Sequence, residues 1–186
     1  MSKIAVFIDG GYLDKILRKE FNGIRIDYDL FPKQICSKVD PQGQLFRTYY
    51  YHCLPYKSNP PSQEESARFA SKQNFYTAIN RLPRFEVRLG KLSRRGPDAQ
   101  GLYHYEQKMV DVLFSIDLVS LSAKMQISDM VIVAGDSDFV PAIQAAKQEG
   151  IIVWLFHGGT WHNELWMNAD ERIRLDQTLI NSVRVV

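Results

Sequence analysis

The chain has 186 residues, 45% of them hydrophobic and 24% charged, a composition that fits a globular protein with a sizeable core and excludes a disordered or fibrous chain. Its 23 lysines and arginines nearly balance 21 aspartates and glutamates, and this net charge of +2 neither demands nor excludes a polyanionic partner. No apolar run approaches a signal peptide or membrane span, and Cys36 and Cys53 form no C-x-x-C pair. We therefore expect one cytoplasmic domain over residues 1–186, with free thiols and no membrane contact.

Short β-branched and aromatic runs alternate with helical segments along the chain. Strands are predicted over Ile4–Ile8, Leu45–Leu54, Phe85–Lys91, Met130–Gly135 and Ile151–Phe156. Helices are predicted over Tyr12–Glu20, Phe31–Val39, from the Ser62–Glu65 capping box to about Leu82, Lys108–Lys124 and Phe139–Gln148. A turn at Arg94–Pro97 is expected to let Leu102–Tyr105 pair with the third strand, and the tail from Trp161 to form loop and short helix. This alternation predicts an α/β fold with a mostly parallel sheet covered on both faces.

The fourth predicted strand runs directly into two acids, Asp136 and Asp138. Because it is parallel and central, these acids fall at the carboxyl edge of the sheet, where open α/β sheets bind ligands. Two carboxylates one residue apart repel each other, and a divalent metal ion is the usual solution. Alternatively, Asp138 caps the following helix and Asp136 lies in the turn. This segment alone leaves both interpretations open.

A third acid, Asp9, ends the first predicted strand and is followed by Gly10 and Gly11. In a doubly wound sheet the first and fourth strands are neighbours at the topological switch point, so Asp9 and Asp136 would face one crevice. The alternative is ordinary Asp-Gly turn chemistry.

A fourth acid, Asp111, lies within an apolar helical segment, which we expect to be buried on more than one side. Burying a carboxylate without a partner is costly. Its partner is either Lys108, one turn earlier, or a metal ion shared with the strand-end acids, and we favour the metal. Asp117 falls about 120° away around the helix, where a solvated or structural role is expected.

The segment from Arg81 to Arg95 holds six basic residues and one acid, Glu86. Such runs are usually solvated surface, but aromatic residues at Tyr103 and Tyr105 follow them. Cations interleaved with aromatics suit single-stranded nucleic acid, because phosphates are attracted and bases stack. The residues predicted to bind substrate backbone are Lys91, Arg94, Arg95 and Lys108. His157, Trp161 and His162 flank a Gly-Gly loop at the same edge and are interpreted as ordinary loop residues, with substrate stacking as the alternative.

Three motifs together resemble the NYN domain, and more narrowly its bacterial LabA-like branch, a relative of the PIN-domain ribonucleases. They are Phe7–Gly11, Gln107–Val112 with Asp117-Leu118, and Gly135–Pro141, and Leu165 with Ala169-Asp170 also fits. The resemblance implies a PIN-like three-layer α/β/α sandwich with about five strands in the order 3-2-1-4-5. It also implies a Mg²⁺- or Mn²⁺-dependent nuclease acting on RNA more than DNA. Carried over by position, the catalytic and metal-binding residues are Asp9, Asp111, Asp136 and Asp138.

The chemistry of the residues agrees with that implication. Carboxylate oxygens suit Mg²⁺ and Mn²⁺, which activate water and stabilise charge on a scissile phosphate. A Toprim enzyme would require Glu in place of Asp9, and a haloacid-dehalogenase phosphatase would require Asp in place of Gly11. A catalytically weak RNA-binding regulatory module of the same fold remains the alternative, and a homodimer is left open.

Overall fold

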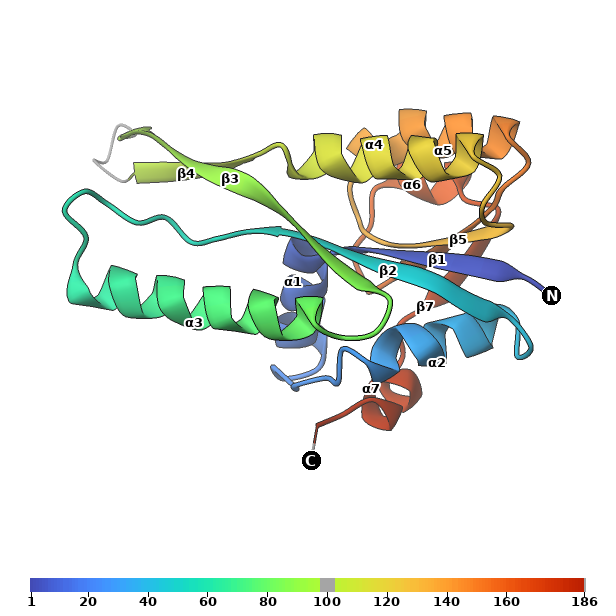
Figure 1. Cartoon of the computed structure of the whole chain (residues 1–186), viewed down its shortest axis with the longest axis horizontal. Coiled ribbons are helices and arrows are strands. Elements are labelled where there is room, and N and C mark those ends of the chain that lie inside the picture. Colours follow the sequence, from blue (N-terminus) through green and yellow to red (C-terminus); the bar gives the residue numbers. More distant parts are fainter. Residues whose placement is uncertain (98–102, 186) are drawn as a thin grey trace.

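The computed structural model describes residues 1–97 and 103–185, and for residues 93–95, 97 and 103–107 it describes the backbone alone. Within these residues a sheet in the order β4-β3-β2-β1-β5-β6-β7 lies between two layers of helices (Figure 1). The strands are β1 (Lys3–Asp9), β2 (Gln44–Cys53), β3 (Phe85–Pro97), β4 (Tyr103–Lys108), β5 (Asp129–Val133), β6 (Ile152–His157) and β7 (Glu171–Arg174). The helices are α1 (Gly10–Glu20), α2 (Leu30–Val39), α3 (Gln63–Asn80), α4 (Val110–Ala123), α5 (Val140–Gln148), α6 (Asn163–Asn168) and α7 (Gln177–Ser182), with a 3₁₀ turn η1 (Ser137–Phe139) before α5.

The predicted strand order is confirmed. The order 3-2-1-4-5 corresponds to β3-β2-β1-β5-β6, and all neighbouring pairs in this series are parallel. One further parallel strand, β7, extends the sheet beside β6. β7 was not predicted, because its four residues, Glu-Arg-Ile-Arg, contain no apolar run and are at most half-buried.

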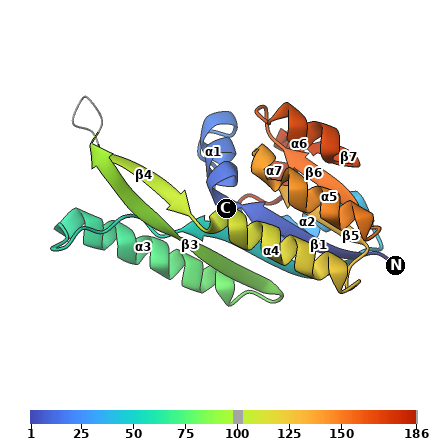
Figure 2. The same cartoon turned by 90° about the horizontal axis from the view of Figure 1, so that it is seen from above.

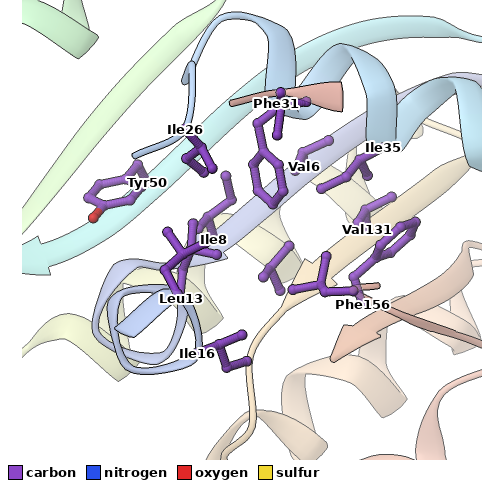
Figure 3. Packing of buried hydrophobic residues seen from close by; sticks show 14 of the residues in the cluster. Val6, Ile8, Leu13, Ile16, Ile26, Phe31, Ile35, Tyr50, Val131 and Phe156 are labelled. Carbon is purple, nitrogen blue, oxygen red and sulfur yellow. The ribbon is translucent and has the colours of Figure 1, made fainter. Parts of the chain in front are cut away.

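Each face of the sheet carries its own hydrophobic core, because β1 lies at its centre and is buried on both sides. Ile4, Val6 and Ile8 pack with α1, α2, α3 and α7, whereas Ala5 and Phe7 pack with α4, α5 and α6. Figure 3 shows Val6 and Ile8 beside Leu13 and Ile16 of α1 and Phe31 and Ile35 of α2. The alternation of side chains along one strand therefore produces the three-layer α/β/α arrangement that was predicted.

The β3–β4 hairpin differs from its prediction. β3 continues to Pro97, so the expected turn at Arg94–Pro97 is wrong, and β4 begins at Tyr103 and ends at Lys108. The antiparallel backbone pairing, which runs from Lys91 opposite Lys108 to Pro97 opposite Tyr103, outweighs the local turn signal. A register shift between Arg94 and Pro97 accommodates the missing N–H of proline. Leu102, where this pairing segment was predicted to begin, lies outside the described residues. The hairpin extends away from the rest of the sheet (Figure 2).

Helix α4 is shorter and more exposed than predicted. It begins at Val110 rather than Lys108, and it is buried on one side only, since Val112 and Ile116 are more than half exposed. The sheet covers the side that carries Phe114 and Leu118. Even this apolar helix falls short of spanning a bilayer, and no other helix in the described part of the chain combines enough length with enough hydrophobicity.

Candidate functional site

The carboxyl ends of β1 and β5 lie side by side, as the sequence analysis expected for its first and fourth strands. Ile8 pairs with Val133 in the parallel register, so the chain leaves both strands at the same edge. Asp9 ends β1, and Asp136 follows β5 after Ala134 and Gly135. Both acids therefore lie at the topological switch point of the sheet. Here β2 is added on one side of β1, and β5 is added on the other side.

Both strand-end acids cap the helical turn that follows them. The Tyr12 backbone N–H donates to Asp9 Oδ1 at 3.1 Å, and the Asp138 N–H donates to Asp136 Oδ1 at 3.1 Å. The alternative interpretation, in which Asp138 caps the helix, is wrong, because η1 intervenes and the N-cap position of α5 is Phe139. Asp136 is the capping residue instead. These caps satisfy backbone N–H groups that have no partner within the first helical turn.

Three of the four predicted acids line one cavity of about 710 Å³. Asp9 comes from the end of β1, Asp136 from the turn after β5, and Asp111 from the first turn of α4. The other lining residues are Gly11, Tyr12, Lys15, Gly135, Thr160, Trp161 and His162. Asp138 is exposed and lies outside this lining.

The acids influence one another's protonation. Burial is the main cause that raises the pKa of Asp9, two backbone N–H groups oppose it, and the negative charge of Asp111 adds to the rise. The pKa of Asp111 is also raised, first by desolvation and then by the negative charges of Asp136 and Asp138. Asp111 therefore interacts electrostatically with each of the other three carboxylates, and a cation or a proton would relieve this repulsion.

The donor set suits a hard divalent cation, because the cavity presents carboxylate oxygens and lacks thiolate or imidazole pairs among its described lining residues. Among the side chains that the structure describes, however, no three His, Cys, Asp or Glu residues converge as a metal centre requires. Asp111 is exposed, so the expectation that its burial requires a partner is wrong. The alternative partner, Lys108, lies in β4 before the helix, and no ion pair joins these two described residues.

The wall of the cavity is formed by Tyr12 and by the loop Gly158–His162, which follows β6. The Tyr12 hydroxyl donates to the Thr160 carbonyl at 2.7 Å and accepts from the Gly158 N–H at 3.1 Å. A Cβ on Gly135 would come within 2.2 Å of the Tyr12 ring, which explains the glycine between β5 and Asp136. Three site residues were not predicted: Tyr12, Lys15 and Thr160. The roles of Tyr12 and Thr160 depend on a contact between segments more than 140 residues apart, and Lys15 lines the cavity only once those segments have met.

Aromatic rings support this loop. Trp161 stacks on Trp166 with centroids 4.7 Å apart and planes inclined by 25°, and His157 meets both rings edge-on. His157 is buried, and this burial is the main cause that lowers its pKa. The interpretation of His157 and Trp161 as ordinary loop residues is therefore too simple, since both belong to an ordered ring cluster beside the cavity.

The predicted cations at the hairpin fall into three groups. Lys91 and Lys108 are directly opposite each other on neighbouring strands, and both are exposed. Arg88 is instead paired with Glu86 at 2.7 Å and with Asp117 at 3.1 Å. Asp117 also accepts from the Tyr51 hydroxyl at 2.9 Å, so it has the structural role expected of it. The side chains of Arg94 and Arg95 lie outside the described residues.

Comparisons with known proteins give one informative match. The family model of the NYN domain matches residues 3–176. No curated protein matches the chain. Among solved structures, the crystal structure of Acinetobacter baumannii MurG shares 11% sequence identity at a TM-score of 0.41, covering 94% of this chain and 42% of that one. The chain thus spans less than half the length of that protein, and a likeness this weak bears on neither fold nor function.

Proposed function

Because the chain belongs to the NYN-domain family, we propose that it is a metal-dependent nuclease that hydrolyses phosphodiester bonds, most often in single-stranded or structured RNA. The family falls within the PIN-like nuclease superfamily, and the motifs around Asp9, Asp111 and Asp136 favour its LabA-like branch. The observation that carries the proposal is the meeting of these three carboxylates, from three separate elements, at one cavity on the carboxyl edge of the sheet.

The acids would hold Mg²⁺ or Mn²⁺, with Asp9, Asp111 and Asp136 as ligands and Asp138 adding negative charge beside them. Burial is the first cause that raises the pKa of Asp9 and of Asp111, and the negative charge of neighbouring carboxylates adds to it. A bound cation would offset this added repulsion, which supports the proposed role. When bound, such an ion supplies a nucleophilic water and neutralises charge that develops on the phosphate. The protein's own contribution is to fix the carboxylates through the backbone hydrogen bonds that cap α1 and η1.

Positive charge at the base of the hairpin supports a polyanionic substrate. Like charges on directly opposite strand residues repel each other, yet Lys91 and Lys108 form such a pair. An anion held between them would relieve this repulsion. Lys108 precedes Asp111 by three residues in the sequence. We propose that these two lysines, together with Arg94 and Arg95, bind the nucleic-acid backbone and carry no base specificity.

The reducing cytoplasm is the compartment that fits this protein best. Cys36 and Cys53 are both free and buried, and burial raises the pKa of the Cys36 thiol to about 12 and that of Cys53 to about 11. Buried thiols with raised pKa values are unreactive packing groups.

A second candidate is a catalytically weak RNA-binding module of the same fold. The observation that favours it is that the described side chains do not converge as a metal centre requires, while Asp9 and Asp136 already act as helix caps. Binding of RNA without cleavage under any metal condition would identify this second function.

The deciding experiment incubates the protein with labelled single-stranded RNA and DNA in Mn²⁺, Mg²⁺ or EDTA. We expect cleavage of RNA with either metal and none in EDTA. Asp136→Asn keeps a capping group but removes a charge, and it should lower cleavage by at least about 100-fold. Asp176→Asn is the matched control, because Asp176 caps α7 in the same way, through the Leu179 N–H at 2.8 Å, and lies outside the cavity lining. Cleavage that persists in EDTA, or a fully active Asp136→Asn protein, would contradict the proposal.

A further inference from the structure

Trp161 is the outermost ring of an ordered stack. Its indole stacks on that of Trp166 with the planes inclined by 25°, and the guanidinium carbon of Arg172 lies 5.7 Å from the Trp166 ring centroid. His157 contacts both indoles edge-on, at 4.7 Å from each centroid. The orientation of Trp161 is therefore set by neighbours on several sides.

Trp161 nevertheless remains exposed. It keeps 38% of its surface accessible, and it contributes to the lining of the cavity that holds Asp9, Asp111 and Asp136. Trp166 covers one face of the ring, and the indole of Trp161 is still a lining residue of the cavity. A rigid, accessible aromatic surface binds a flat ring at little entropic cost, because its own freedom is already lost.

The position of Trp161 relative to the acids is fixed by hydrogen bonds on both sides of it. Thr160, which precedes it, accepts from the Tyr12 hydroxyl, and His162, which follows it, donates its N–H to the Gly135 carbonyl at 3.0 Å. Tyr12 follows Asp9 by three residues, and Gly135 directly precedes Asp136. The segments that carry the carboxylates therefore also hold the indole.

A cation completes this side of the cavity. Lys15 is exposed and lines both the carboxylate cavity and an adjoining groove of about 330 Å³, which Lys19 and Arg174 also line. Neither Lys15 nor Lys19 forms an ion pair with any described residue. An unpaired ammonium beside an aromatic surface is the combination that binds the phosphate and base of one nucleotide.

We propose that Trp161 is the stacking platform for one nucleobase of an unpaired strand, and that a phosphate next to that base lies against Lys15. The inference rests on the proposed function and specifies its substrate class, single-stranded nucleic acid. A duplex buries the faces of its bases in its own stack, so it cannot offer one to Trp161 without unpairing.

The test measures binding of a short single-stranded RNA in EDTA, where metal-dependent cleavage is absent. Trp161→Ala should weaken binding by about 5- to 150-fold, the range expected for the loss of one stacked base. Trp161→Phe keeps a ring and should stay within a few-fold of the parent. Met167→Ala removes an exposed apolar side chain on α6 that does not line the cavity, and it should bind as the parent does.

Two probes separate base from phosphate. An abasic strand should bind the parent as weakly as the normal strand binds the Trp161→Ala protein, and the substitution should have no further effect on the abasic strand. Lys15→Gln should weaken binding of normal and abasic strands by the same factor. A duplex of the same sequence should be insensitive to Trp161→Ala. Because the abasic comparison uses the parent protein, it can overturn the proposal even where a variant fails to fold.

Three results would overturn the inference: equal binding of normal and abasic strands by the parent, unchanged binding after Trp161→Ala, or equal losses for duplex and single strand. If the protein cleaves RNA with Mn²⁺ and gives any of these three results, the proposed nuclease activity stands and the proposed stacking site is wrong. Conversely, if binding depends on Trp161 but no metal supports cleavage, the proposed stacking site stands and the proposed nuclease activity is wrong.

Discussion

The loop Gly158–His162 and the base of the β3–β4 hairpin are two candidate substrate-contacting regions, and they are held in different ways. The loop depends on long-range side-chain contacts, chiefly the Tyr12 hydroxyl and the stacked ring of Trp166. The hairpin depends on backbone pairing between neighbouring strands, and Lys91 and Lys108 extend from it into solvent. A region fixed by tertiary contacts can hold an aromatic ring at a defined place. Exposed lysines on a hairpin attract phosphate groups by charge, and this attraction does not require an exact position of the ammonium group.

The largest expected effect concerns the acids themselves. Mn²⁺ at about 100 times its dissociation constant should raise the parent's free energy of unfolding by about 2.7 kcal/mol, because the ion binds only the folded state. In the Asp136→Asn protein this rise should be much smaller. Without metal, the variant should melt at the parent's temperature or above it, since one repelling charge is gone.

Thermal denaturation with and without Mn²⁺ makes this measurement. A structural role for Asp136 predicts the reverse, namely a loss of roughly 0.5–2 kcal/mol in any buffer. A parent that is indifferent to Mn²⁺, together with a metal-free variant that melts clearly lower, would overturn the metal site.

The next effect should disturb the loop and spare the hairpin. Tyr12→Phe removes one donor and one acceptor, which should cost about 1–3 kcal/mol because the Gly158 N–H and Thr160 carbonyl lose their partner. Amide hydrogen exchange should accelerate at Gly158 and His162. Tyr76→Phe is the matched control, since its buried hydroxyl donates to the Cys53 carbonyl at 3.2 Å, away from the loop. Equal acceleration in both variants would show that the loop does not depend on Tyr12.

A pH effect should also be confined to the loop side. Burial lowers the pKa of His157 in the folded protein. As the pH falls through about 6.5, this side chain is therefore protonated in the unfolded chain before it is protonated in the folded protein. The free energy of unfolding should therefore fall as the pH drops below about 6.5, by at most about 1.4 kcal/mol per pH unit from this group. Chemical denaturation of the parent and His157→Asn between about pH 5 and 7.5 measures the difference. His162→Asn, at an exposed ring, is the control, and a parent–His157→Asn difference that is constant across this range would contradict the assignment.

The smallest effect should appear at the hairpin. Lys91→Gln or Lys108→Gln should weaken RNA binding similarly for every sequence and reduce the slope of log affinity against log salt by about 0.7 for each charge removed. Lys38→Gln on α2 provides an exposed control far from the cavity lining. An unchanged salt slope in the double variant would place the phosphate contacts elsewhere, and a sequence-dependent loss would mean that these lysines contact bases.

The sequence by itself determined the alternation of strands and helices and the positions of Asp9 and Asp136 at strand ends, because each depends on local periodicity and on general rules of parallel sheets. The full order of the central strands followed from the resemblance of the three motifs to the NYN domain. It did not determine β7, since the half-buried edge strand Glu171–Arg174 has no apolar pattern and forms only by pairing with β6. It also placed a turn at Arg94–Pro97, where pairing with β4 overrides local preference.

Only the tertiary structure decided which acids share a cavity and what surrounds them. Asp111 was expected to be buried, yet it lies exposed at the start of α4, and its approach to the strand ends depends on how that helix packs on the sheet. Tyr12, Lys15 and Thr160 have no sequence pattern that marks them, because a hydrogen bond across 148 residues leaves no local trace. The exposed indole of Trp161 is defined in the same way, by a ring stack and two backbone hydrogen bonds that exist only once β1, β5 and β6 have assembled.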